Sequence, residues 1–506
     1  MDEAVESSRL EKLHKIEKLG LDPWGHRFDA HQPIQTILQL PADLPEGQRP
    51  AVKAAGRIVS RRIGGKVHWL DIRDWSGQLT TRKTTSDDDK HEATEFTDWS
   101  SRVQVMIGQK QVGASGWALA HELDLGDLLG VEGKFGKTKR GEPTIFAEKL
   151  TFLGKSLEPH PDKWSGLSDM EYRLRHRYLD LTYNAELLDR TLKRIKILRR
   201  MRSYLDERGY CEVETPTLHA IAGGAAARPF NTHHNALDIP LYLRIALELH
   251  LKRLLVGGIE KVYEIGRVFR NEGISQKHNP EFTMMELYQA YANYETMMEL
   301  TEGLILACIE TIGGGYIRPY GKHTIDFTPP WSRLAYGDAF HEHVGVAMNN
   351  EAGVKSASQK NHLEINGKDH AVLVHELFEH KVEHKLTGAV FVYDYPAALC
   401  PLTKRKAGDP KIAERFELYV HGMEVANAYT ELNDPIMQEQ TFSQQLAGLP
   451  EEDSMAKMDH DFIRAIRHGM PPAGGLGIGV DRMVMLLTNT QTIRDVILFP
   501  LLRPEK

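Results

Sequence analysis

The stretch that decides the fold is Val262–Tyr291, which reads VYEIGRVFR NEGISQKHNP EFTMMELYQAY. Residues alternate as in a β-strand over Val262–Arg270 and again over Glu281–Tyr291. The polar loop Asn271–Pro280 separates the two runs, so they are predicted to form a hairpin and not a parallel unit with a helix between its strands. This pattern favours an α+β domain built on an antiparallel sheet.

One face of this hairpin carries unusual residues for a half-buried strand. Residues two apart share a face. On the second strand these are Phe282, Met284, Glu286 and Tyr288. Arg270 and Glu272 point the same way at the end of the first strand. Because buried charges are costly without partners, this face is predicted to line a ligand site. A set of internal salt bridges is the alternative.

A second strand–turn–strand unit is predicted at 414–433, with its turn at His421–Gly422. Its polar residues are Glu417, Glu424, Asn427, Tyr429 and Glu431. The last three have the same parity and therefore face the same side. Together the two hairpins collect several carboxylates in one region, which requires cations, either magnesium or a cationic substrate.

The third candidate segment is Gly474–Leu487, a glycine-rich strand that runs into an apolar helix near Asp481. Alternate glycines leave an open floor where a flat ring can approach the backbone. Arg482 lies at the helix start and could stack on such a ring. Close packing of the strand against the helix explains the glycines equally well. The glycine spacing does not match a dinucleotide-binding loop, so no organic cofactor is expected.

Toward the N-terminus the pattern changes to short strands separated by glycine. The five predicted strands are Ala54–Ser60, Val67–Asp74, Val103–Ile107, Leu128–Gly133 and Ile145–Leu153. Five short strands in about 100 residues favour a small OB-fold barrel. We expect an N-terminal helix and linker over 1–49, the barrel over 50–155, a loop at 84–100, a boundary at 164–168, and the α+β domain over 165–506.

Composition excludes several classes of protein. A formal charge of −7 argues against a DNA-coating protein. Three separated cysteines without a CxxC pair argue against a disulfide framework or a zinc site and favour a reducing compartment. The N-terminus shows no signal peptide, and no apolar run is long enough to cross a membrane. We therefore expect a cytoplasmic protein.

The three segments resemble the motifs of the class II aminoacyl-tRNA synthetases, and in detail those of the lysyl-tRNA synthetase family. Arg270–Gly273 with His278–Phe282 resembles motif 2, and Gly475–Arg482 resembles motif 3. Leu198–Pro216, a helix followed by CEVETP, resembles the dimer-forming motif 1. The resemblance runs from about residue 50 to the C-terminus, and class I signatures are absent.

The resemblance implies a class II catalytic domain after the barrel, with lysine, ATP, Mg²⁺ and tRNA(Lys) as ligands and a homodimer as the assembly. Arg270 and Arg482 are the implied catalytic residues. The implied ATP-binding residues are Arg270, Glu272, His278, Asn279, Phe282, Glu417, Glu424, Gly479 and Arg482, of which Glu417 and Glu424 also hold the metal. The implied lysine-binding residues are Gly224, Glu248, Arg270, Glu286, Tyr288, Asn427, Tyr429 and Glu431. A pocket of carboxylates would repel aspartate, the substrate of a sibling enzyme.

The barrel has basic residues next to aromatic ones, which suits unstacked bases. The resemblance implies that it reads the anticodon, with Arg61 and Trp69 as the candidate contacts. A Trp69 side chain in the barrel core is the alternative. The chain departs from the family at Leu247, where proline is usual, and at Thr80, where bacterial enzymes are expected to carry an anticodon-reading glutamine.

Two other functions fit parts of the sequence. A protein-lysylating relative is expected to lack the barrel, whereas this chain has the strands of one. An inactive RNA-binding relative is expected to have lost motif residues, whereas Arg270, Glu424 and Arg482 are present.

Overall fold

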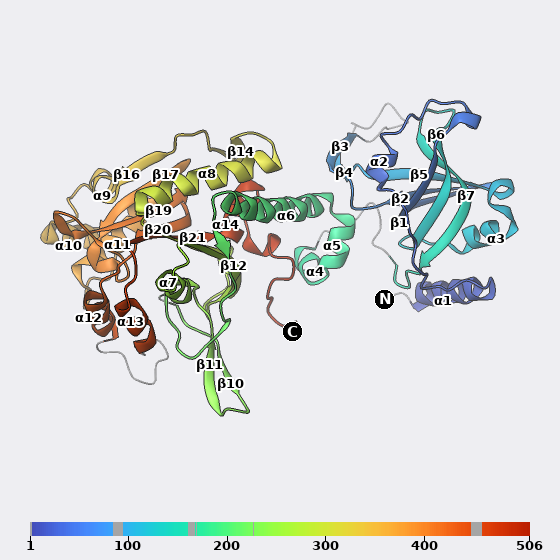
Figure 1. Cartoon of the computed structure of the whole chain (residues 1–506). Helices are drawn as coiled ribbons and strands as arrows, with labels where there is room; N and C mark the ends of the chain where they lie inside the picture. The colour runs from blue at the N-terminus through green and yellow to red at the C-terminus, as the bar shows by residue number, and fades with distance from the viewer. Residues whose placement is uncertain are drawn as a thin grey trace. The chain divides into compact units, whose positions relative to one another are not determined.

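The computed structural model describes residues 3–83, 95–159, 167, 169–225, 227–446 and 458–505. These residues form two compact units, Met1–Asp189 and Arg190–Lys506 (Figure 1). The expected boundary at 164–168 lies outside the described residues except for residue 167. No helix in the described ranges is long and apolar enough to cross a membrane.

The first unit contains a closed five-stranded barrel, as the sequence predicts. Its strands follow the order β1-β2-β5-β7-β6. Their bounds are Ala51–Gly64 for β1, Val67–Arg73 for β2, Arg102–Gly108 for β5, Leu128–Lys137 for β6 and Pro143–Gly154 for β7. The barrel interior is filled by aliphatic side chains such as Ile58, Leu70 and Val105, all at most 1% exposed. Helix α3 (Gln109–Glu122) connects β5 to β6.

The prediction of a loop at 84–100 is wrong for its last part. Residues Glu95–Trp99 form strand β4, which pairs antiparallel with β3 (Leu79–Lys83). Trp99 is 1% exposed and pairs with Leu79, so burial of one aromatic ring outweighs the polar composition of the segment. Residues 84–94 of that predicted loop lie outside the described residues.

The N-terminal helix α1 (Glu3–Lys18) packs onto the barrel unit. Its Leu13 and Ile16 are buried. The Lys12 ammonium lies 2.5 Å from the Asp124 carboxylate, and Arg9 donates to the backbone oxygen of Ser156 at 2.7 Å. The short segments α2 (Ile34–Ile37) and η1 (Glu46–Gln48) follow, and α4 (Met170–Arg175) and α5 (Arg177–Tyr183) complete the described helices of this unit.

The second unit is built on a nine-stranded sheet of order β16-β17-β19-β20-β21-β13-β12-β8, with β18 paired to β19. Its strands are β8 (Cys211–Glu212), β12 (Lys261–Phe269), β13 (Glu281–Ala290), β16 (Ser332–Ala335), β17 (Ala389–Pro396), β18 (Arg405–Lys406), β19 (Asp409–Val420), β20 (Met423–Thr430) and β21 (Ala473–Gly479). The central pairs from β17 to β12 are antiparallel, as predicted. The edge pairs β12–β8 and β16–β17 are parallel, so the sheet is mixed.

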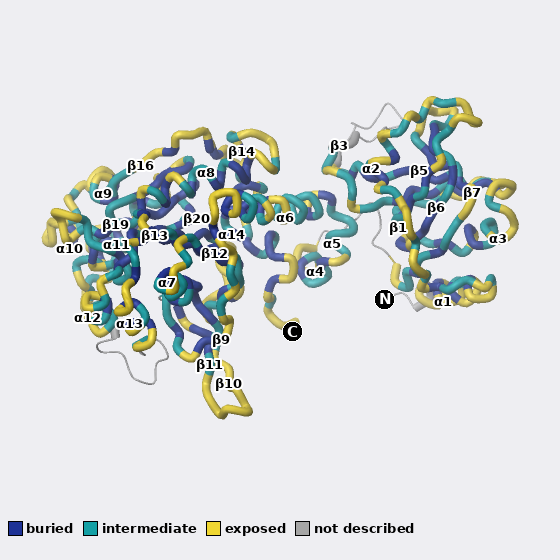
Figure 2. Tube along the Cα trace, in the orientation of Figure 1, coloured by how far each residue is buried: buried dark blue, intermediate teal, exposed yellow. Residues whose placement is uncertain are grey.

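Helices cover the sheet on both sides. One cluster of buried side chains joins the sheet to α6 (Ala185–Asp206), α8 (Tyr294–Ile312) and α14 (Val480–Leu487). Other clusters lie under α7 (Glu248–Val256) and α13 (His460–Arg467), and under α9 (Tyr336–Val344), α10 (Glu351–Lys360) and α11 (His370–Lys381). The central strands β13, β20 and β21 are mostly buried, whereas β10 (Asn231–His234) is exposed along its length (Figure 2).

The remaining elements of this unit are one further helix and several short segments. They are β9 (Leu218–His219), β11 (Ile239–Leu243), β14 (Ile317–Tyr320), β15 (His323–Asp326), η2 (Glu383–Lys385), η3 (Ala397–Leu399), α12 (Pro435–Leu446) and η5 (Ile493–Asp495). Strands β9, β10 and β11 form a separate small sheet.

Candidate active site

Two adjoining cavities lie over the central strands of the second unit. The larger has a volume of about 480 Å³ and reaches from β13, β20 and β21 to α7 and the segment 399–403. The smaller, of about 160 Å³, is lined by the loop of the first predicted hairpin and by the start of α14. The residues common to both walls are Arg270, Met284, Asn427 and Gly477. Two different ligands bound in these cavities would therefore meet beside Arg270.

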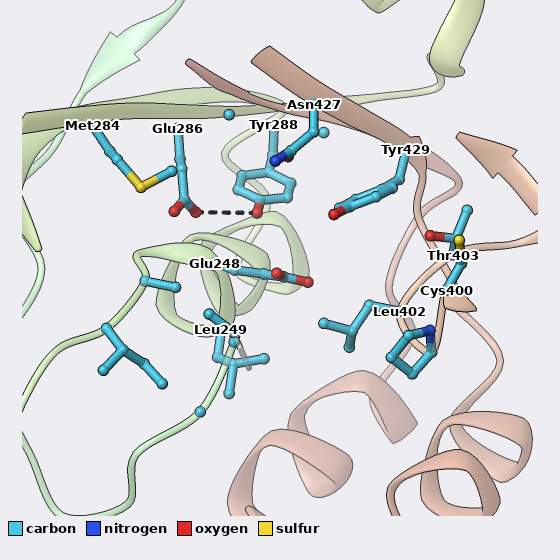
Figure 3. A pocket seen from close by; sticks show the side chains of 18 of the residues that line it. Glu248, Leu249, Met284, Glu286, Tyr288, Cys400, Leu402, Thr403, Asn427 and Tyr429 are labelled. Carbon is cyan, nitrogen blue, oxygen red and sulfur yellow. Dashed lines mark hydrogen bonds between the residues drawn. The ribbon is translucent and has the colours of Figure 1, made fainter. Parts of the chain in front are cut away.

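Strand register explains how distant residues reach the larger cavity. Glu286 of β13 is paired with Gly477 of β21, which is paired with Asn427 of β20. The next row in the same direction joins Tyr288, Gly475 and Tyr429. The polar side chains of β13 and β20 therefore stand on either side of a strand that has no side chain between them (Figure 3).

The glycines of β21 are required by this arrangement. A Cβ atom at residue 475 would lie 1.9 Å from Oε1 of Glu431 and 2.6 Å from the Tyr288 ring. Real Cβ contacts do not come that close, so Gly475 is needed for the carboxylate and the ring to occupy their places.

Glu286 is a buried carboxyl group on the cavity wall. It accepts a hydrogen bond from the backbone N–H of Leu247 at 3.1 Å, and the Tyr288 hydroxyl donates to it at 3.4 Å (Figure 3). Burial, followed by the negative charge of Glu248, raises the pKa of Glu286 to about 7. A cation bound in the cavity would offset both effects by favouring the ionised carboxylate, so the wall is suited to an ammonium group.

Glu431 occupies a deeper position than the other candidate residues. It is 0% exposed, and one of its oxygens lies 2.5 Å from the Lys252 ammonium. The same ammonium lies 2.5 Å from the Glu248 carboxylate. Glu248 lines the larger cavity, whereas Glu431 is not among the described residues that line it. Lys252 was missed in the sequence, although its place four residues after Glu248 on a helix puts the two on one face.

The smaller cavity brings together the candidate nucleotide residues. Its wall includes Arg270, Glu272, His278, Asn279, Phe282, Glu424, Gly479 and Arg482. The Arg270 guanidinium lies 5.2 Å from the centre of the Phe282 ring. Arg482 donates to the Glu424 carboxylate at 3.2 Å and lies 3.2 Å from Nε2 of His278. This arrangement supplies cationic groups and a flat aromatic surface for an anionic ligand that carries a ring.

The start of α14 is fixed by a buried carboxylate. Asp481 accepts from the backbone N–H of Thr283 at 2.7 Å and forms an ion pair with Arg194 of α6. Because Arg482 is the next residue, these contacts set the position from which its side chain enters the cavity.

Glu424 and Asn427 meet because of an irregularity in the sheet. The register of β19 with β20 shifts so that Val425 is an extra residue between Glu424 and Ala426. Such a bulge redirects the side chains beside it. As a result, the Asn427 amide donates to Glu424 at 3.2 Å although the two residues are three apart.

Glu417 is paired with Asn427 across the strands, which places it on the same face. It is buried, and it accepts hydrogen bonds from the hydroxyls of Tyr395 at 2.9 Å and Tyr419 at 2.6 Å. Burial acts to raise the pKa of Glu417, but the adjacent Arg415 guanidinium and the two hydroxyls hold it below its ordinary value. Glu417 is therefore ionised. It is not among the described residues that line either cavity, so it lies behind the cavity walls.

Arg415 is a second residue that was missed in the sequence. It lines the larger cavity, forms an ion pair with Glu417, and lies 5.4 Å from the centre of the Tyr429 ring. Alternation along β19 places Arg415 on the same face as Glu417, and this parity could have identified it as a site residue from the sequence.

The two candidate contacts on the barrel differ in their surroundings. Trp69 is half-buried, lies between the buried residues His68 and Leu70, and pairs with Arg62 across β1 and β2. Its side chain therefore lies outside the buried core cluster, on the face that also presents Arg62. The Arg61 side chain makes contacts within the barrel unit: it donates to the backbone oxygen of His121 at 3.0 Å and lies 3.8 Å from Asp124.

Comparison with known proteins gives consistent matches. Residues 169–503 match the family model described as class II tRNA synthetases (D, K and N). The chain is 47% identical over 503 residues to a lysine–tRNA ligase of Moorella thermoacetica, covering 98% of this chain and 97% of that protein. It is 46% identical over 504 residues to lysine–tRNA ligases of Bacillus thuringiensis and Bacillus anthracis, covering 98% of this chain and 96% of each.

Proposed function

The chain belongs to the class II tRNA synthetases (D, K and N), and from this premise we propose that it is a lysine–tRNA ligase, which activates L-lysine with ATP and transfers it to tRNA(Lys). The observation that carries the proposal is the pair of adjoining cavities: the wall of the larger includes Glu248 and Glu286, and Arg270 stands where it meets the smaller, whose wall also includes Lys277 and Arg482. A carboxylate-lined cavity selects a cationic side chain and rejects aspartate. This charge distribution separates the lysine enzyme from its relatives in the same family.

The lysine substrate is proposed to lie in the larger cavity. Its ammonium groups would be held by Glu286 with the Tyr288 hydroxyl and by Glu248 with Gly224, while Asn427 and Tyr429 complete the wall. Arg270, at the junction of the two cavities, would hold the lysine carboxylate beside the α-phosphate of ATP. Glu431 would contribute negative charge from below the wall, where it is paired with Lys252.

ATP is proposed to lie in the smaller cavity. Phe282 and Arg482 would enclose the adenine ring, Glu272 and Asn279 would contact its edge, His278 would lie near the phosphates, and Gly479 would give the backbone room to approach. The lysine carboxylate attacks the α-phosphorus and pyrophosphate leaves. The terminal hydroxyl of tRNA then attacks the carbonyl carbon of lysyl-adenylate, and AMP leaves. These steps require positioning and offset of negative charge, which Arg270 and Arg482 supply, and no nucleophilic side chain.

Mg²⁺ is proposed to accompany ATP, held by Glu417 and Glu424. Glu424 lines the smaller cavity and accepts a hydrogen bond from Asn427 at 3.2 Å, and Glu417, behind the wall, is paired with Asn427 across the strands. Mg²⁺ is usually held by one or two carboxylates together with substrate phosphates, and Glu417 and Glu424 would supply those carboxylates. When bound, the ion would neutralise charge on the phosphate oxygens.

The barrel is proposed to bind the anticodon of tRNA through Trp69, and Arg62 now joins it as a candidate because the two residues are paired.

The segment of α6 and β8 that resembles motif 1 is proposed to form a homodimer. The three cysteines are free thiols, in keeping with the proposed cytoplasmic location.

The direct test of this function is a charging assay. Purified protein, ATP, Mg²⁺ and unfractionated tRNA are supplied with all twenty amino acids, and the aminoacyl group released from tRNA is identified by mass. The proposal predicts lysine. Recovery of aspartate or asparagine would assign the chain to a sibling activity of the same family.

A further inference from the structure

Lys252 is a fully buried ammonium group that the proposed chemistry does not use. It is 0% exposed, on helix α7, and its Nζ lies 2.5 Å from a carboxylate oxygen of Glu248 and 2.5 Å from one of Glu431. Burial alone would lower the pKa of Lys252, but the charges of Glu248 and Glu431 raise it above its ordinary value. The side chain is therefore a fixed positive charge beneath the floor of the cavity.

The other charged groups near the cavity are already paired. Arg415 forms an ion pair with Glu417, and Asp459 forms one with Arg253 at 2.9 Å. The unbalanced charges are the carboxylates of Glu248, Glu286 and Glu431, together with Lys252 and with Arg270 at the junction. When all three carboxyl groups are ionised, they and one ammonium leave two negative charges, which equals the two ammonium groups of free lysine. Arg270 remains for the carboxylate of the amino acid.

We propose that Lys252 is a positioning residue that sets the selectivity for lysine: it fixes Glu248 and Glu431 and reduces the negative charge of the pocket to the value that one lysine neutralises. The inference rests on the proposed function and adds a residue that acts on the substrate only through its neighbours. Without Lys252 the buried Glu431 has no counter-ion, and one of the clustered carboxyl groups must take up a proton or the pocket must admit a further cation.

Two single variants and their combination test this role by ATP–pyrophosphate exchange. Lys252→Met keeps an unbranched side chain, one atom shorter, and removes its charge. It is expected to raise the KM for lysine at least about tenfold, with a smaller fall in kcat and little change in the KM for ATP. Since the unpaired carboxyl group then titrates within the pocket, the KM for lysine of Lys252→Met should also fall more steeply with rising pH than that of the unmodified protein.

The double variant Lys252→Met/Glu431→Gln removes one positive and one negative charge. Because the net charge returns to that of the unmodified pocket, its KM for lysine should be at least about tenfold lower than that of Glu431→Gln alone, in which the ammonium repels the substrate. This variant also leaves no unpaired Glu431 carboxylate, so it remains measurable if Lys252→Met does not fold. A double variant no better than Glu431→Gln would overturn the proposal.

Lys155→Met is the matched control. Lys155 is also a buried lysine between two carboxylates, 2.7 Å from Asp124 and 2.9 Å from Asp127, but it belongs to the barrel unit. Its replacement should lower the melting temperature and leave the KM for lysine unchanged. If the KM for lysine rises equally in Lys155→Met and Lys252→Met, Lys252 is merely structural. Absence of lysine-dependent exchange in the unmodified protein would instead refute the proposed function, and this inference with it.

Discussion

Gly475 lies against Glu431 so closely that a Cβ atom would stand 1.9 Å from the carboxylate oxygen. Gly475→Ala is therefore expected to displace Glu431 or the Tyr288 ring, at a cost of about 1–3 kcal/mol from overpacking. The KM for lysine should rise much more than the KM for ATP. Gly477→Ala is the milder comparison, because its Cβ would lie 3.3 Å from Asn427. Equal exchange kinetics for Gly475→Ala and the unmodified protein would contradict the described packing.

Lysine binding should depend on pH through Glu286. Burial and the charge of Glu248 raise the pKa of Glu286 to about 7. Below that value the carboxyl group is protonated and cannot pair with an ammonium group, and above it the group is ionised. The KM for lysine should therefore fall between about pH 6 and about pH 8, by up to about tenfold per pH unit below the pKa. In Glu286→Gln the KM should be high and should vary less with pH over this range, because Glu431, whose pKa burial raises to about 8, is then the remaining carboxyl group that titrates there.

Arg270→Ala should abolish adenylate formation while leaving the protein folded. Arg270 borders both cavities and is half-buried, and its Nε donates only a long hydrogen bond, to the backbone oxygen of Ile245 at 3.4 Å. Loss of such a charge-stabilising group is expected to cost about 3 kcal/mol or more in transition-state binding. Single-turnover adenylate formation and a melting curve measure the two effects separately. Normal activation by a folded Arg270→Ala protein would remove this residue from the phosphate site.

Trp69→Ala should weaken tRNA charging without affecting lysine activation. A base stacked on this ring would contribute roughly 1–3 kcal/mol, so the KM for tRNA should rise while pyrophosphate exchange stays the same. Trp69 is half-buried and outside the barrel's buried cluster, so the melting temperature should change little. Arg61→Met should show the opposite pattern, because Arg61 is bound to His121 and Asp124. A large loss of stability in Trp69→Ala would place its ring in the core.

Much of the fold could be predicted because the central strands are adjacent in the sequence and alternate in polarity. Both hairpins, Val262–Tyr291 and 414–433, lie where their patterns indicated. The parallel edge strands could not be predicted, since β8 and β16 are short and pair with segments far along the chain. The hairpin of β3 and β4 was missed because its apolar contacts depend on tertiary packing of Trp99.

The candidate site was only partly predictable for a similar reason. Parity along one strand identifies residues on a common face, as with Glu286 and Tyr288. It does not show that a lysine on a neighbouring helix is buried, because Lys252 has the sequence pattern of a solvent-exposed helix face. Nor does it show the bulge at Val425 that brings Glu424 to Asn427. These features arise from contacts between separate elements.

The central claim is that the carboxylate-walled cavity selects lysine, and ATP–pyrophosphate exchange with single amino acids tests it most directly. Lysine, norleucine, aspartate and asparagine are compared at matched concentrations near pH 7.5. Norleucine has the aliphatic chain of lysine without the ammonium group, so it isolates the contribution of charge. We predict exchange with lysine and, for the other three, rates lower by a factor of about a hundred or more, since a buried carboxylate left without its partner costs about 3–5 kcal/mol. Comparable exchange with norleucine or aspartate would contradict the claim.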